Sequence, residues 1–103
     1  MRDTQVETPE LVTPELLQAW RLPQPSGSKR SRGQVVVVGG ALRSPGAALL
    51  AGRATLRVGA GRLTLAVGAS VAGAVAVALP ESGVVPLAET SSGSVRGTGV
   101  RAA

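Results

Sequence analysis

The chain has 103 residues with a formal net charge of +5, and it contains one Trp, one Met and no Phe, Tyr, Cys or His. The lack of Cys and His excludes disulfides, thiolate metal sites and acid–base chemistry by histidine. The core must then consist of Val, Leu and Ala, which predicts one small domain of marginal stability.

The basic residues are concentrated in the middle of the chain, where no acidic residue occurs. This segment is predicted to attract an anion such as a nucleotide, a nucleic acid or a membrane surface. The alternative is that the arginines only keep an Ala- and Gly-rich chain soluble, because ten of the basic residues are Arg and one is Lys. Both interpretations stay open. Eight basic residues lie between Leu16 and Pro80: Arg21, Lys29, Arg30, Arg32, Arg43, Arg53, Arg57 and Arg62.

The N-terminal residues 1–9 are predicted to be disordered. Asp3 and Glu7 stand where a signal peptide would have a cationic and then an apolar region, so we expect a cytoplasmic protein rather than an exported one. The longest apolar region, residues 45–79, is interrupted by three arginines and is not expected to span a membrane.

A short helix is predicted after Thr13, which can cap it, with Pro14 in the first turn and Glu15 complementing the helix dipole. The sequence LLQAW then supplies an apolar patch, and RLPQPSGSKRSRG is predicted to be a loop. Gln34–Val38 follows as a strand, and its four consecutive valines are typical of a strand buried on both faces of a parallel sheet.

A second helix is predicted from about residue 45 to about residue 58, with Ser44 as its cap and Pro45 at its first position. Apolar residues cover most of this helix, so we expect it to be largely buried, with one wet stripe at Arg53 and Arg57. Gly59 and Gly61 should end it. A buried strand at Leu63–Val67 then completes a right-handed parallel crossover.

Beyond Ser70 the sequence VAGAVAVAL fits a helix capped by Ser70 or, by its alternating valines, a strand; its length and its alanines favour the helix. A third short strand is predicted at Val84–Leu87, and residues 91–103 are predicted to be a loop-like tail with too few apolar residues to pack. The sequence therefore predicts an α/β fold, an open sheet that stops after about three strands.

The glycine turns do not fit the standard nucleotide-binding motifs. Gly39, Gly40 and Gly46 lack the Gly-x-Gly-x-x-Gly spacing, and no Lys precedes a Ser or Thr at the helix start. The helix start at Ser44 can still bind an anion through free amides, whereas the alternative, which the motif alone favours, is that Gly39 and Gly40 only make a tight turn and allow close packing. Glu81 and Glu89 are the only acids near the predicted sheet, and Glu81, which follows a proline, is expected to be a surface residue rather than a base, so no catalytic group is assigned.

Several ordered motifs carry a family resemblance. They are KRSRG at residues 29–33, the Gly39-Gly40 turn, PGAALLAG at the second helix start, LRVGAG at residues 56–61 and ALPE at residues 78–81. Over residues 10–90 the chain resembles the ADP-dependent NAD(P)H-hydrate dehydratases, the C-terminal half of bifunctional nicotinamide-nucleotide repair proteins. The resemblance implies a ribokinase-like fold and an enzyme that uses ADP or ATP, with Mg²⁺, to dehydrate hydrated NADH or NADPH. It also implies that Ala47, with Gly46 and Ala48 beside it, lines the substrate pocket.

The chain also departs from that family. The later Gly-Pro-Gly loop, the pocket histidine and the Gly-Thr-Gly-Asp stretch with the catalytic aspartate have no counterpart, and Gly97-Thr98-Gly99 comes too early and lacks the Asp. The chain is therefore expected to be an N-terminal portion that is inactive by itself, while a homo-oligomer of the full-length protein stays open.

Two other interpretations remain as alternatives. One is a small basic module that grips a nucleotide or nucleic acid through residues 29–32, Arg53 and Arg57; the other is a partly unfolded fragment without function. Nucleic acid is the less expected partner because aromatic side chains for base stacking are missing.

Overall fold

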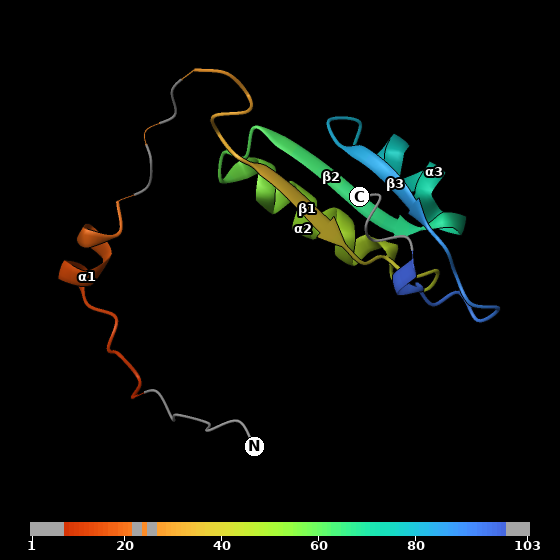
Figure 1. Ribbon diagram of the computed structural model, residues 1–103, viewed down its shortest axis with the longest axis horizontal. Coiled ribbons are helices and arrows are strands. Elements are labelled where there is room, and N and C mark those ends of the chain that lie inside the picture. Colours follow the sequence, from red (N-terminus) through yellow and green to blue (C-terminus); the bar gives the residue numbers. More distant parts are fainter. Residues whose placement is uncertain (1–7, 22–23, 25–26, 99–103) are drawn as a thin grey trace.

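The computed structural model of this chain describes residues 8–21, 24 and 27–98. Three strands form one parallel sheet in the order β1-β2-β3, and the chain alternates between strand and helix along it (Figure 1). This confirms the α/β class and the parallel pairing. Most of the segment expected to be disordered, residues 1–7, lies outside the described residues. The elements are α1 (Pro14–Ala19), β1 (Gln34–Val38), α2 (Pro45–Arg57), β2 (Arg62–Gly68), α3 (Ala69–Ala78) and β3 (Gly83–Leu87).

Helix α1 begins as the sequence predicts. The Thr13 side chain accepts a hydrogen bond from the Leu16 amide at 3.2 Å, Pro14 opens the first turn and Glu15 follows it. The helix has no buried residue and lies away from the sheet in Figure 1. Its exposed apolar residues therefore add nothing to the core.

Helix α2 ends in a glycine motif, which confirms the role predicted for Gly59. Gly59 adopts a positive φ of 104°, its amide donates to the Leu56 carbonyl, and the Ala60 amide donates to the Thr55 carbonyl. These two bonds satisfy carbonyls that the last helical turn leaves free, and the positive φ is accessible to glycine at little cost. The chain can therefore turn at once into β2.

The core lies between strand β2 and the two helices that follow β1 and β2. Leu63, Leu65 and Val67 alternate along β2 and are at most 2% exposed, which places one face of the strand against both helices. Ala48 of α2 meets that face, and Val71 and Val75 of α3 complete the cluster with Leu79 just after it. The expected core of Val, Leu and Ala is thus confirmed.

Strand β1 was expected to be buried on both faces, and this is wrong. Val36 and Val38 are 47% and 50% exposed, whereas Val37 packs partly against the core. The physical reason is that β1 is an edge strand, and the described helices α2 and α3 cover one face of the sheet only. The side chains of β1 that point to the other face therefore stay in contact with solvent.

The largely buried character expected for α2 is also wrong. Only Ala48 and Gly52 of this helix are buried, and Leu50 is 70% exposed. One layer of helices on a short sheet can bury one stripe of each helix, so an apolar residue elsewhere on α2 has nothing to pack against.

Residues 69–78 form the helix that the sequence favoured over a strand, but its cap is not Ser70. The N-cap residue is Gly68, and Ser70 lies in the first turn.

The region after β3 is a loop that folds back on the carboxyl edge of the sheet. The Arg96 amide donates to the Ala88 carbonyl at 2.7 Å, and the Leu42 amide donates to the Gly93 carbonyl at 3.1 Å. Over the described part of the chain, none of the helices is long and apolar enough to cross a membrane.

Candidate functional site

The carboxyl ends of the three strands lie at one edge of the sheet, which is where open α/β sheets bind their ligands. Backbone bonds continue past the strands here: the Gly39 amide donates to the Ala66 carbonyl at 3.0 Å, and the Gly68 amide donates to the Gly40 carbonyl at 3.3 Å. The first turn of α2 begins just beyond these bonds. The residues that the family resemblance singled out are in this turn.

Gly46, Ala47 and Ala48 follow one another but meet different surroundings. Gly46 and Ala47 are exposed, and a Cβ atom added at Gly46 would have no neighbour within 4 Å. Ala48 is only 3% exposed and belongs to the core. Gly46 and Ala47 are thus open to a ligand at the carboxyl edge, while the Ala48 side chain packs on the sheet.

The glycine turn after β1 is explained by packing at Gly40. Gly40 has a φ of +73°, and a Cβ atom there would lie 3.0 Å from Val67 Cγ1 and 3.3 Å from the Cβ of Ala48. The residue must therefore be glycine both for its backbone angle and for the close approach of α2 to β2. This confirms the packing interpretation of the turn at Gly40.

The helix starts at this edge are capped differently from what the sequence suggested. Ser44 is the N-cap residue of α2, as predicted, but its side chain makes no cap hydrogen bond. At α3 the Glu89 carboxylate accepts one bond from the Ser70 amide at 3.2 Å and another from the Ser70 hydroxyl at 2.7 Å. Glu89 thus satisfies a free amide of the first turn and complements the helix dipole.

Glu89 is half-buried against α3. The approach is close: a Cβ atom at Gly68 would overlap the Glu89 side chain. No local signal reveals this contact, since Ser70 and Glu89 are separated by a whole helix and strand. Its geometry assigns Glu89 a capping role.

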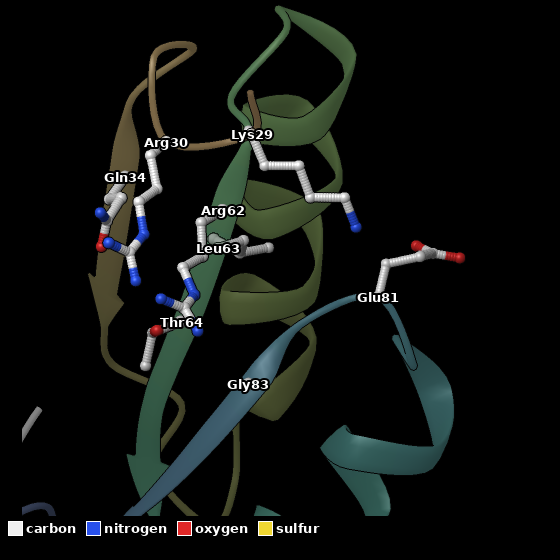
Figure 2. A pocket seen from close by; sticks show the side chains of 9 residues that line it. Lys29, Arg30, Gln34, Arg62, Leu63, Thr64, Glu81 and Gly83 are labelled. Carbon is white, nitrogen blue, oxygen red and sulfur yellow. The ribbon is translucent and has the colours of Figure 1, made fainter. Parts of the chain in front are cut away.

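A hollow of about 630 Å³ lies at the opposite edge, where the strands begin (Figure 2). The loop before β1 contributes Lys29 and Arg30 to its wall. Both residues belong to the motif KRSRG at residues 29–33, whose neighbours in space come from segments distant along the chain. The remaining lining residues come from the strand starts and from the turn before β3: Gln34, Gly61, Arg62, Leu63, Thr64, Glu81 and Gly83.

The described residues do not assemble a metal centre. No three of their Asp, Glu, His or Cys side chains lie together as metal ligands would. The Mg²⁺ implied by the family resemblance thus finds no carboxylate cluster to hold it in the described part of the chain.

Fold and site together define an α/β protein with consecutive parallel strand–helix–strand units and an accessible helix start at the carboxyl edge. Comparison with known proteins adds a specific relative: the chain is 51% identical over 84 residues to the ADP-dependent (S)-NAD(P)H-hydrate dehydratase of Xanthomonas campestris pv. campestris. The match covers 82% of this chain and 29% of the relative, so the chain spans less than a third of that protein's length. The resemblance to the NAD(P)H-hydrate dehydratases is thereby confirmed. No protein-family profile matches the chain, and no solved structure does.

Proposed function

We propose that this chain forms part of an NAD(P)H-hydrate dehydratase, a lyase that uses ADP or ATP, with Mg²⁺, to return hydrated NADH or NADPH to the intact cofactor. The observation that carries the proposal is the 51% identity to the Xanthomonas protein over most of this chain. The proposed fold of the complete domain is ribokinase-like, with the three described strands as one portion of its sheet.

Within that enzyme, we assign Gly46 and Ala47 to the wall of the pocket for the hydrated nicotinamide, with Ala48 behind them. Two features support the assignment. The residues open helix α2 at the carboxyl edge of the sheet, and a ligand can approach both of them from solvent. The small side chains leave room for a ring to lie against the first turn, whose free amides offer hydrogen-bond donors.

The catalytic group itself is proposed to come from outside residues 8–98. Among the described residues, Glu89 is the carboxylate at the carboxyl edge, and it is engaged by the amide and hydroxyl of Ser70. A group held in this way positions a helix. We therefore expect the 103-residue chain to show no dehydratase activity when it is assayed alone.

A segment exchange tests the proposal. The 84-residue stretch of the Xanthomonas enzyme that matches this chain would be replaced by the corresponding residues of this chain, and ADP-dependent formation of NADH from hydrated NADH would be followed by absorbance. We expect the chimera to be active, because the two segments are proposed to play the same part. A folded chimera without activity would refute the proposal.

The assignment of Ala47 has a matched control on the same helix. Ala47→Trp in the chimera should raise the KM for hydrated NADH by about tenfold or more, since a large ring at the pocket wall would occupy the space proposed for the substrate. Ala54→Trp introduces the same ring at another exposed position, about 10 Å further along α2, and should leave KM unchanged. Equal KM values for the two variants would remove Ala47 from the pocket while leaving the function itself untouched.

A further inference from the structure

We propose that the hollow at the amino edge of the sheet is a second binding site, which takes the diphosphate group of a small molecule. It lies at the strand starts, at the edge opposite Gly46 and Ala47. Its volume of about 630 Å³ is within the range of pockets that hold a small ligand.

The wall of this hollow is built by hydrogen bonds. The Gly33 carbonyl, in the loop before β1, accepts bonds from the amides of both Gly61 and Arg62, at 3.1 and 3.2 Å. Within the loop, the Gly33 amide donates to the Arg30 carbonyl at 3.2 Å. Gly61 lies so close under the loop that a Cβ atom there would overlap the Lys29 carbonyl. The backbone that carries Lys29 and Arg30 is therefore fixed against the start of β2.

The strand register adds further donors to the same hollow. Gln34 pairs with Arg62, and Thr64 pairs with Gly83. Residues that are paired across parallel strands, and residues two apart along one strand, project from the same face. Arg62 and Thr64 thus join Gln34 on the face that the described helices leave open. Figure 2 shows these side chains and that of Arg30 projecting into the hollow, while Gly83 leaves space beside Thr64.

The charge of the hollow selects an anion. Lys29, Arg30 and Arg62 line it together with one carboxylate, Glu81. In Figure 2, Arg30 and Arg62 lie beside Gln34 and Thr64, whereas Lys29 extends toward the side on which Glu81 lies. None of the three cations forms an ion pair with another described residue, so no described carboxylate competes with a ligand for them. Guanidinium groups bind phosphate oxygens in a bidentate manner, and neutral amide and hydroxyl donors complete such sites. A diphosphate satisfies several of these donors at once.

The test is titration of the 103-residue chain with inorganic pyrophosphate at constant ionic strength, followed by calorimetry and by amide chemical shifts. We expect saturable binding with shifts confined to residues 29–34, 61–64 and 81–83. Arg30→Gln with Arg62→Gln should weaken binding by about tenfold or more. The control, Arg53→Gln with Arg57→Gln, removes the same charge from the exposed side of α2 and should change affinity by less than about twofold.

A second variant tests whether binding depends on the shape of the hollow or only on its positive charge. A Cβ atom at Gly83 would lie 3.7 Å from Thr64 Oγ1, an ordinary contact, so Gly83→Val fits the strand and fills the hollow with every charge retained. It should weaken pyrophosphate binding as strongly as the double arginine variant. Absence of binding to the wild-type chain, equal losses in the α2 control, or unchanged affinity in Gly83→Val would overturn the proposal.

Two further titrations decide which molecule carries the diphosphate. ADP that binds no more tightly than pyrophosphate would support a site for the diphosphate group alone, and tighter ADP binding with the same shifted amides would support a nucleoside diphosphate. Duplex DNA that binds more tightly than either and displaces pyrophosphate would overturn the assignment to a small molecule.

Discussion

The glycines at the centres of α2 and α3 should respond oppositely to the same substitution, Gly→Ala. Gly52 is buried, and a Cβ atom there would lie 3.0 Å from a methyl carbon of Leu79 and 3.1 Å from methyl carbons of Leu63 and Leu65. Gly73 has no neighbour within 4 Å of the same added atom. The two sites therefore share the backbone effect and differ in packing.

The magnitudes follow from these surroundings. Alanine in a helix interior is favoured over glycine by about 1 kcal/mol in the free energy of unfolding, and Gly73→Ala should gain about that amount. At Gly52 the same gain opposes an overpacking cost of about 1–3 kcal/mol. The three leucines are at most 4% exposed, so they have little room to move. We expect Gly52→Ala to lose about 1 kcal/mol net, which is about 2 kcal/mol below Gly73→Ala.

The assay is thermal unfolding followed by far-ultraviolet circular dichroism. Trp20, the C-cap residue of α1, is 64% exposed, so its fluorescence does not report on the sheet. For a domain of this size, a difference of about 2 kcal/mol separates the two melting temperatures by about 8–16 °C. If both variants gain stability equally, the packing of α2 on β2 is looser than the structure indicates and the reasoning is refuted.

Three further substitutions test other features. Glu89→Ala should lower the free energy of unfolding by about 1–2 kcal/mol, because α3 loses its cap. Glu89→Gln should lose less, since it keeps an acceptor for the Ser70 hydroxyl. Equal losses of the two variants in urea unfolding would contradict the capping role. Gly61→Ala should break the two hydrogen bonds to the Gly33 carbonyl and lower the free energy of unfolding by about 1 kcal/mol for each bond. Hydrogen exchange at the amides of residues 61 and 62 should then accelerate. Unchanged exchange would show that the loop is not anchored there. Val36→Thr with Val38→Thr should lower the free energy of unfolding by less than about 1 kcal/mol, because both side chains are about half exposed on the open sheet face; a larger loss in urea unfolding would mean that this face is covered.

The elements of the sheet could be predicted well because their ends carry local signals. Gly39 follows the valine strand, Pro45 begins α2 and Gly59 ends it through bonds made by neighbouring residues. Such signals depend on backbone angles and hydrogen bonds within a few residues of the chain. The strand and helix boundaries therefore lie within two residues of those expected for each strand and for α2 and α3.

Burial could not be predicted in the same way. Four valines in β1 indicate strand propensity, but whether they are buried depends on how many layers cover the sheet, and one helical layer is described. The bond between Ser70 and Glu89 and the hollow beside Lys29 join segments that are distant along the chain. Of the candidate site, the sequence indicated the start of α2 and the basic loop, while the position of each relative to the sheet required the fold.

The order of the strands also has a kinetic consequence. Each strand pairs with the one that precedes it in the chain, so Gln34 meets Arg62 and Thr64 meets Gly83. Each pairing closes a loop that contains one helix, and loop-closure entropy grows slowly with such lengths. None of the three described strands has to wait for a later segment to be inserted between it and its neighbour. The sheet can therefore assemble in the order of synthesis, with β1 and β2 docked on α2 before β3 has left the ribosome.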